Sequence, residues 1–230
     1  MSTPDAPDWQ RVVQTVQSTG AVPDAPDWER IVVGPGGAPV GGGGGGGGAG
    51  GLTPAVYGWQ QWSAPLWTIT NYPAWPVAGG ILLVGMVAGS AATWSSAFVR
   101  VINVGTSPVT DENYVGLYAA TISGGSLSSL ALVASSAAGA ADNAWTVAGF
   151  TPVDFATAYK VTAGTLYYAA FLANMGGYPD IGGPQGTIYG LDSAIPLAAY
   201  SSGPYTALPS SLTSADLTAF PQTTFWAGVA

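Results

Sequence analysis

The sequence predicts an all-β protein: a single β-sandwich of jelly-roll type that spans residues 52–230 and follows an extended arm and a glycine-rich linker. Three observations lead to this fold class. Only 7% of the residues are charged, against about 25% in ordinary soluble domains, and small neutral residues take their place. Apolar and β-branched runs alternate with turn signals about every eight to twelve residues. After the glycine run, no stretch keeps the apolar periodicity of a helix.

A ten-residue peptide near the start of the chain occurs twice, and it sets residues 1–33 apart as an arm. The copies begin at Pro4 and Pro23, and eight of their ten positions are identical. Their prolines disfavour helix in the preceding residue, and each copy holds a tryptophan, a residue that often anchors interfaces. We therefore interpret the arm as a duplicated docking peptide for a partner protein. The residues expected to make the contacts are Asp8, Trp9, Arg11, Asp27, Trp28 and Arg30.

The sequence leaves the conformation of each repeat open. Asp8 and Asp27 could cap a single helical turn, whereas the β-branched residues after each arginine could add a strand to the edge of a partner's sheet. A passive tail with an accidental duplication is the plainer alternative. Two copies suit two equivalent pockets, either on symmetry-related subunits of the partner or along one subunit.

Residues 34–51 form a glycine-rich linker that contains eight successive glycines, Gly41–Gly48. Such a run behaves as a flexible coil whose root-mean-square reach is about 5–6 Å times the square root of its length. We expect a swivel between a docked arm and a displayed domain, although the run could also thread a channel or pack in the core of a trimer. It is not a phosphate-binding loop, because no Lys-Ser/Thr pair follows it.

Residues 52–76 are rich in aromatic side chains, with Gln60, Gln61 and Asn71 between them. Aromatic walls with a few polar groups are typical of small-molecule sites, and such rings can stack on the apolar face of a sugar. The alternative is that the rings seal one end of the β-sandwich or the seam of a trimer. The candidate glycan-binding residues are Trp59, Trp62 and Tyr178.

The strands expected in the domain are the runs that are most apolar or richest in β-branched and aromatic residues. Gly124-Gly125 is expected to form a turn after which the chain pairs back, and residues 137–148 a connection of small residues. The expected strands are Gly80–Ala88, Thr93–Val104, Asn113–Ala119, Ser126–Ser135, Phe150–Phe155, Thr157–Thr162 and Thr165–Ala173.

The charge balance argues against several classes of partner. The net charge is −8 and the pI about 4.1. Binding to nucleic acid needs clustered lysine and arginine, but only Arg100 and Lys160 follow the glycine run. An anionic membrane surface is disfavoured for the same reason. The most apolar run, Ile81–Ala88, is far shorter than the roughly 20 residues of a membrane-spanning helix, so no membrane insertion is expected.

The chain contains neither cysteine nor histidine. Disulfides, Ser-His-Asp and Cys-His arrangements and zinc sites of the usual kind are therefore excluded. The remaining route to an enzyme is a pair of carboxylates that hydrolyse a glycan. Asp111 and Glu112 are adjacent and would point to opposite sides, whereas Asp180 and Asp192 flank one loop and could meet. We expect solvated turn acids, no enzyme, no cofactor and no metal, with calcium on oxygen ligands as the alternative.

Two signatures resemble bacteriophage proteins. The repeated arm peptide resembles segments of minor tail proteins of siphophages that infect actinobacteria. The order of Tyr114–Tyr118, Leu130–Ser136, Trp145 and Tyr159–Ala170 resembles the β-sandwich domain of such tail and fibre proteins. The resemblance implies a virion structural protein, often trimeric, that lies near the tail tip and contacts the host envelope.

From the residues and this resemblance we expect a non-enzymatic minor tail or tail fibre subunit, docked to the tail tip or baseplate by its arm and displaying the β-sandwich towards the host surface. A capsid decoration or head fibre protein and a carbohydrate-binding module for receptor recognition are the alternatives. The low charge and a mean hydropathy of +0.32 suggest buried surface between subunits, which favours a homotrimer. No signal peptide is visible, so we expect synthesis in the host cytoplasm and a final location in the virion.

Overall fold

The computed structural model describes most of the domain that follows the linker. All described residues belong to one compact unit, Leu52–Ala230. The docking residues expected in the arm, the glycine run and Trp59 lie outside the described residues. The described residues are 54, 60–63, 69–71, 75, 78–184, 194–220 and 225–230.

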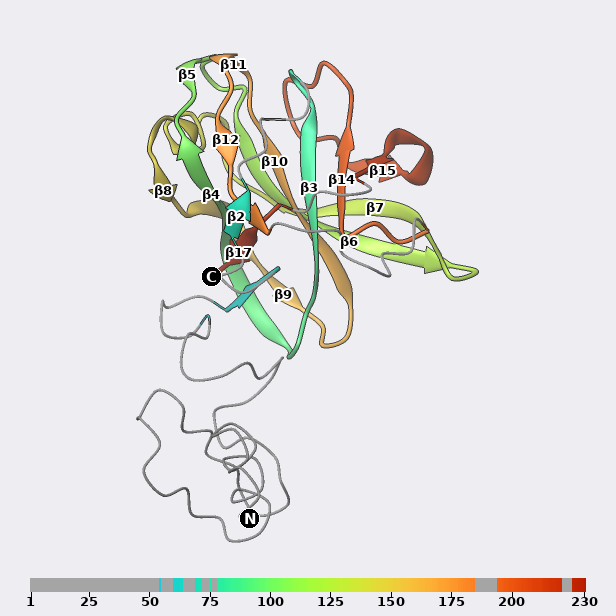
Figure 1. Ribbon diagram of the computed structural model, residues 1–230. Coiled ribbons are helices and arrows are strands. Elements are labelled where there is room, and N and C mark those ends of the chain that lie inside the picture. Colours follow the sequence, from blue (N-terminus) through green and yellow to red (C-terminus); the bar gives the residue numbers. More distant parts are fainter. Residues whose placement is uncertain are drawn as a thin grey trace, which may run out of the picture. The chain divides into compact units, whose positions relative to one another are not determined.

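This part of the chain is all-β, as composition and turn spacing predict, and Figure 1 shows its strands gathered into antiparallel sheets. Among the described residues the helical turns η4 and η5 are single 3-10 turns. The elements are β1 (Gln61–Trp62), β2 (Ile69–Asn71), β3 (Ile81–Val87), β4 (Ala92–Asn103), β5 (Thr106–Pro108), β6 (Tyr114–Ser123), β7 (Ser126–Ser135), η4 (Ala144–Thr146), β8 (Gly149–Phe150), β9 (Val153–Val161), β10 (Leu166–Leu172), β11 (Met175–Gly177), β12 (Asp180–Ile181), β13 (Gly183–Pro184), β14 (Ala198–Ser201), β15 (Ser211–Thr213), η5 (Ser214–Asp216), β16 (Thr218–Ala219) and β17 (Ala227–Val229).

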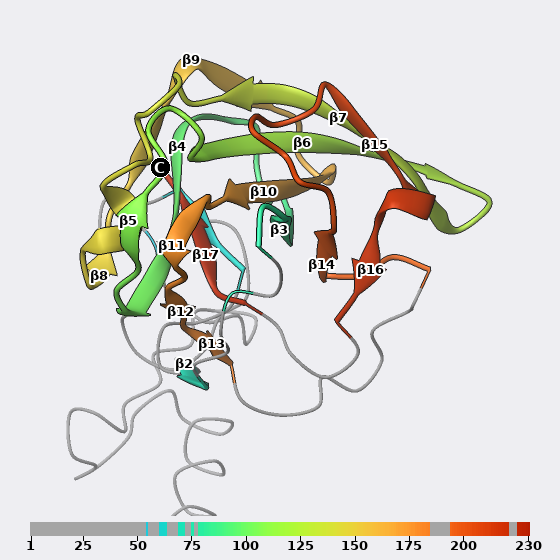
Figure 2. The same ribbon diagram turned by 90° about the horizontal axis from the view of Figure 1, so that it is seen from above.

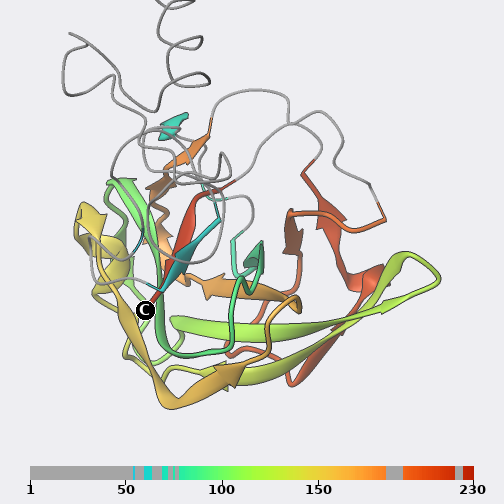
Figure 3. The same cartoon turned by 90° about the horizontal axis from the view of Figure 1, so that it is seen from below.

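Two larger sheets make the sandwich. The first has seven strands in the order β15-β7-β6-β10-β3-β14-β16, and Figures 2 and 3 show it curling like half of a barrel. The second has six strands and is organised around the long strand β4. Strands β9 and β17 meet β4 on opposite edges, since both pair with Ala97. Strand β1 extends this sheet beyond β17.

The main core lies between the two sheets. Its residues come from alternate positions of the strands, because successive side chains of a strand point to opposite faces. On β3 these positions are Leu82, Val84 and Met86, and on β10 Tyr167 and Phe171 belong to the same cluster. The alternation explains why β3 reads as one continuous apolar run: its other face is buried as well.

A second core fills the other face of the seven-stranded sheet. It contains Ile81 and Leu83 of β3, the intervening positions of the same strand, together with Tyr118 and Tyr168. The Tyr118 hydroxyl donates a hydrogen bond of 2.7 Å to the carbonyl of Pro209, and the Tyr168 hydroxyl donates to the carbonyl of Pro196. Both phenols are thus buried with a partner for their polar atom, as burial requires.

Burial has a consequence for the ionisation of these tyrosines. It raises the pKa of Tyr168 to about 12, because the apolar surroundings disfavour the charged phenolate. Burial also raises the pKa of Tyr118 well above its ordinary value, and nearby Tyr205 adds to the effect. Both side chains are therefore neutral at physiological pH.

The hairpin of β6 and β7 turns at Gly124-Gly125, as the sequence predicts. Both glycines have positive φ, +60° and +79°, which is the combination that a two-residue type I′ turn requires. The two glycines connect Ser123 to Ser126, and these two serines pair with each other across the hairpin. A β-carbon added at either glycine would meet nothing within 4 Å, so glycine is needed here for its backbone conformation and not for space.

The strand boundaries differ from the expected ones mainly around β9. Two strands, Phe150–Phe155 and Thr157–Thr162, were expected, whereas one continuous strand runs from Val153 to Val161 and only Gly149–Phe150 stands apart. The register of β9 against β4 shifts between Trp94 and Ser96. Trp94 pairs with Tyr159 and Ser96 with Asp154, so residues 155–158 of β9 bulge out of the pairing with β4 although the strand runs through them.

Candidate functional site

The outer face of the six-stranded sheet carries a group of aromatic side chains, which we call the outer aromatic cluster. Side chains alternate along β4, so that Val99 and Val101 enter the main core whereas Phe98 faces outward. Phe98 packs there against Phe150 and Trp226, and Trp226 in turn packs against Trp62. The members of the cluster are Trp62, Phe98, Phe150 and Trp226.

Strand pairing places three of these residues side by side. Trp62 of β1 pairs with Gly228 of β17, and Gly228 pairs in turn with Phe98 of β4. Directly paired residues lie on the same face of a sheet. Trp226 stands two residues before Gly228 and therefore points to that face as well.

Position 228 has no room for a side chain, because two aromatic rings lie over the backbone there. A β-carbon at this position would be 2.7 Å from Cζ of Phe98 and 3.0 Å from Cη2 of Trp226. Contacts below 3.0 Å force a neighbouring group to move, and here both neighbours are buried rings. The glycine thus allows Phe98 and Trp226 to close over the backbone of β17.

Trp226 is the centre of the cluster. Its ring centroid lies 5.1 Å from that of Phe150, 5.8 Å from that of Phe98 and 6.5 Å from that of Trp62. The contacts with Phe150 and Trp62 are edge-on, with interplanar angles of 64° and 63°. Aromatic pairs in such arrangements contribute about 0.5–1.5 kcal/mol each beyond the area that they bury.

A cation adjoins the cluster. Arg100 of β4 pairs with Phe150 of β8, and its guanidinium carbon lies 5.7 Å from the centre of the Phe150 ring. This distance is within the range of a cation–π interaction. The guanidinium brings hydrogen-bond donors to the margin of an otherwise apolar surface.

The four side chains of the cluster differ in their exposure to solvent. Trp226 and Phe98 are 0% and 1% exposed, whereas Trp62 and Phe150 are half-buried. The first two form a rigid floor, and the other two present part of their rings above it. The accessible parts of such rings are suited to stack on the apolar face of a sugar, and the Arg100 guanidinium beside Phe150 is suited to donate hydrogen bonds to its hydroxyls.

The candidate glycan-binding residues separate in the structure. Trp62 belongs to the outer aromatic cluster. Tyr178, between β11 and β12, is half-buried and packs against the main core between the sheets. The described residues therefore supply Trp62 to the candidate site and do not bring Tyr178 into the same cluster.

Two of the turn acids, Asp142 and Asp180, accept hydrogen bonds from neighbouring groups of the domain. Asp142 accepts the backbone N–H of Asp111 at 3.2 Å and the side-chain amide of Asn113 at 2.9 Å, and Asn113 is fully buried. Asp180 accepts from the side-chain amide of Asn103 at 2.7 Å, while Asp192 lies outside the described residues. Within the described residues no three acidic side chains gather in an arrangement that could hold a metal ion.

Asp216 has a comparable structural role in the capping box of η5. Its carboxylate accepts hydrogen bonds from the backbone N–H and the hydroxyl of Thr213, at 2.7 Å and 2.8 Å. The backbone hydrogen bond lowers the pKa of this carboxyl below its ordinary value, and the hydroxyl adds to the effect. The charged form thus stabilises the turn between β15 and β16.

A small cavity lies at the margin of the second core. Its volume is about 70 Å³, and Leu127, Pro196, Ser214 and Leu217 are among its lining residues. Ligand pockets usually measure about 300–1,000 Å³. This cavity is too small for a sugar, so the outer aromatic cluster is the better candidate for recognition.

Sequence reasoning missed three members of the site, Phe98, Phe150 and Trp226, and the neighbouring Arg100. One signal was available: Phe98 and Arg100 alternate with Ala97, Val99 and Val101, which indicates a strand with two different faces. The partners could not be found in this way, because Phe150 and Trp226 come from distant strands.

Comparisons with known proteins add no relative: no protein-family model and no curated protein matches the chain. In the part of the chain that the structure describes, no helix has both the length and the apolar character needed to cross a membrane.

Proposed function

We infer that this chain is a non-enzymatic virion structural protein, a minor tail or fibre subunit of a phage. In this proposal the repeats of residues 1–33 dock the chain to the tail tip or baseplate, and the β-sandwich is displayed for contact with the host surface. The observation that carries the proposal is the duplicated tryptophan-containing peptide, separated by eight glycines from an all-β domain. This order of parts suits an anchor, a swivel and a displayed head.

The low charge of the chain supports a further part of the proposal. Only 7% of the residues are charged, and surfaces that become buried between subunits are depleted in charge. We take a homotrimer as the assembled state. A capsid decoration or head fibre protein has the same build, and it differs only in the surface onto which the arm docks.

The docking role is tested in particles. Immunogold electron microscopy with an antibody against this protein should label the tail tip, whereas label on the capsid would favour the head fibre. A chain without residues 1–33 should be lost from particles, and so should a Trp9→Ala, Trp28→Ala variant. The matched control is Trp62→Ala, which leaves the arm intact. Normal incorporation of the shortened chain would overturn the proposal.

A second candidate function, binding of a host envelope glycan, is favoured by the outer aromatic cluster. Trp62 and Phe150 present half-exposed rings, and the guanidinium of Arg100 lies 5.7 Å from the Phe150 ring centre. We expect a fluorescent fusion of the full chain to bind actinobacterial cells saturably, and Trp62→Ala to weaken this binding at least tenfold. Val87→Ala, which trims an exposed apolar side chain of the other sheet, is the control. Equal binding of both variants would remove the outer aromatic cluster as the binding site.

A further inference from the structure

The hairpin of β6 and β7 extends beyond the sheet to which it belongs. Strand β6 pairs with β10 from Tyr114 to Ala119 only, but its pairing with β7 continues to Ser123. Figures 1 and 2 show the end of this hairpin projecting from the body of the domain. We call Ala120–Ser123 the open edge, because among the described residues these four have a strand on one side only.

An open edge presents unpaired backbone N–H and C=O groups, which is a template for pairing with another strand. Thr121, Ile122 and Ser123 are all exposed, and Ile122, an apolar residue, is 41% exposed. Native proteins usually protect such edges with lysine, other charges, proline or a covering element. Ala120–Ser123 contains no charged residue and no proline, and the protective device beside it is a register shift between Thr121 and Ile122 in the pairing with β7.

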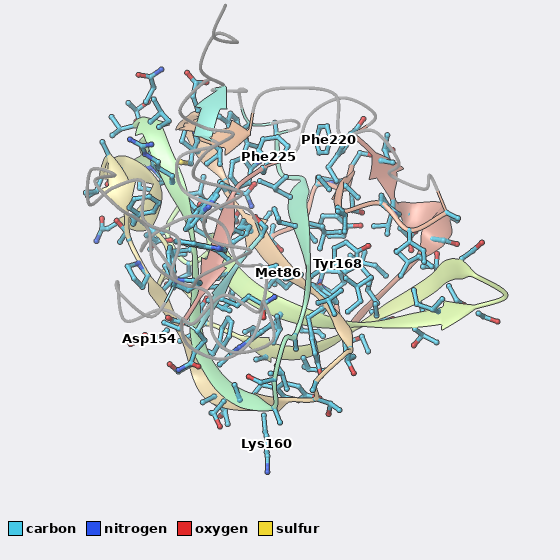
Figure 4. All side chains as sticks on the ribbon, turned by 60° about the horizontal axis from the view of Figure 1, so that its bottom comes forward. Met86, Asp154, Lys160, Tyr168, Phe220 and Phe225 are labelled. Atoms are coloured by element: carbon cyan, nitrogen blue, oxygen red, sulfur yellow. The ribbon has the colours of Figure 1, made fainter. Side chains whose placement is uncertain are left out.

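Strand β9 of the same domain carries the charged residues that usually protect an edge. Strand β9 pairs with β4 on one edge and carries two charges, Asp154 and Lys160, both exposed. Figure 4 shows Lys160 pointing away from the sheet. By contrast, the hairpin of β6 and β7 lies within residues 113–141, and these residues include no charged side chain.

The charge of the chain indicates which partner fits the open edge. Each copy has a net charge of −8, so two copies repel wherever their acidic surfaces approach within about the Debye length of 8–10 Å. The hairpin is a long uncharged stretch, and two hairpins can meet without bringing like charges together. A strongly charged partner would gain no electrostatic attraction here.

We propose that the open edge, Ala120–Ser123, is a contact between copies of this chain, in which it pairs in antiparallel fashion with the same edge of a second copy. Pairing of an edge with itself has two-fold symmetry. The contact therefore doubles whatever assembly the rest of the surface forms, from monomer to dimer or from trimer to a pair of trimers. This inference stands apart from the proposed function, because it does not depend on where the chain is mounted.

The first test is a charge placed on the edge. Thr121→Lys places an exposed cation opposite the apolar Ile122 of the second copy, and an edge lysine is a usual protection against strand pairing, so we expect light scattering of the full chain to give half the wild-type mass. Thr157→Lys introduces the same change on β9, where Thr157 is also exposed, and should keep the wild-type mass. Equal masses for the wild type and Thr121→Lys overturn the proposal.

The second test uses the absence of cysteine from the chain. In antiparallel edges the β-carbons of facing residues are about 4.5–5.5 Å apart and those of diagonal neighbours about 7–8 Å. In this pairing Thr121 faces Ile122 of the second copy, so a short bismaleimide should join a Thr121→Cys copy to an Ile122→Cys copy in an equimolar mixture, and the product should have twice the chain mass on a denaturing gel. Thr157→Cys should stay uncrosslinked at the same protein concentration. Absence of crosslinking in the mixture of Thr121→Cys and Ile122→Cys, with the fold of both variants confirmed by circular dichroism, also overturns the proposal.

Discussion

Both sheets of this domain bury part of the face that points away from the main core, but they do so differently. The seven-stranded sheet curls around a second core whose residues include Ile81 and Leu83, and two buried tyrosines bond to loop carbonyls. The six-stranded sheet stays open around β4 and covers its outer face with a few rings centred on Trp226. Figure 4 labels Tyr168 in the first region.

The difference separates a face that is closed by a second core from a face on which two of four rings are half-buried. A second core closes the curled sheet, and a small cavity of about 70 Å³ lies at its margin. The outer aromatic cluster instead has a buried floor and a half-exposed rim, so part of its apolar surface stays accessible. Substitutions should therefore affect stability alone in the second core, but stability or recognition in the cluster, depending on the residue.

The largest effect is expected at the floor of the cluster. Trp226→Ala removes a fully buried indole with three aromatic neighbours and should lower the free energy of unfolding by about 3–5 kcal/mol. Trp62→Ala, at the half-exposed rim, should cost clearly less. Urea denaturation of both variants measures the two values. Equal losses would mean that floor and rim are not distinct.

A slightly smaller loss is expected in the second core. Leu83 is fully buried there, and Leu83→Ala should cost about 2–5 kcal/mol, because it removes buried methyl groups and leaves a cavity. Unlike a change in the outer aromatic cluster, it should leave cell binding of the folded protein unchanged. Urea denaturation measures the loss of stability, and the cell-binding measurement on the same preparation checks that binding is unchanged. A binding loss without a stability loss would contradict the structural role of this core.

The fit of the rings over β17 is tested by adding one carbon. Gly228→Ala places a β-carbon 2.7 Å from the Phe98 ring and should cost about 1–3 kcal/mol, the usual range for overpacking. Gly125→Ala is a useful comparison, since it meets no neighbour and is strained only through its positive φ, by about 1–2 kcal/mol. A double variant Gly228→Ala, Phe98→Leu should recover part of the loss at Gly228 if the clash with Phe98 is its cause.

Substitution of a buried tyrosine is expected to have the smallest effect on the free energy of unfolding at neutral pH. The effect of the tyrosines on stability becomes larger at alkaline pH. An unfolded tyrosine ionises near pH 10, whereas the folded protein keeps the pKa of Tyr168 at about 12. Between these values the folded state binds more protons, so stability is complete below pH 10 and is lost as the pH rises towards 12. The slope is about 1.4 kcal/mol per pH unit for each such tyrosine.

Tyr168→Phe isolates this effect. At pH 7 it should cost only about 1 kcal/mol, because the hydrogen bond to the carbonyl of Pro196 is lost. Between pH 10 and 12 it should reduce the dependence of stability on pH by about 1.4 kcal/mol per pH unit. Tyr159→Phe, which changes a half-buried tyrosine against the main core, is the control. An unchanged alkaline slope in Tyr168→Phe would show that burial of this phenol does not govern the response.

Local features were predictable because they depend on short stretches of chain. The run of β3, the hairpin turn at Gly124-Gly125 and the strand Ser126–Ser135 follow from β-propensity and from the backbone freedom of glycine. The strand β9 was less predictable, since its small central residues read as a break. Residues 155–158 stay in the strand although they bulge out of its pairing with β4, and the local pattern does not reveal such a bulge.

By itself, the sequence determined the β character of the domain, the near absence of charge, the repeated arm peptide and the two-faced pattern of β4. Only the tertiary structure decided that Trp62, Phe98 and Phe150 gather around Trp226, and that Tyr178 packs elsewhere. The physical reason is that a period of two tells which residues share a face of one strand, but not which strands become neighbours. That choice depends on how two sheets bury their apolar faces together, and it joins residues more than 160 positions apart, as the pairing of Trp62 with Gly228 does.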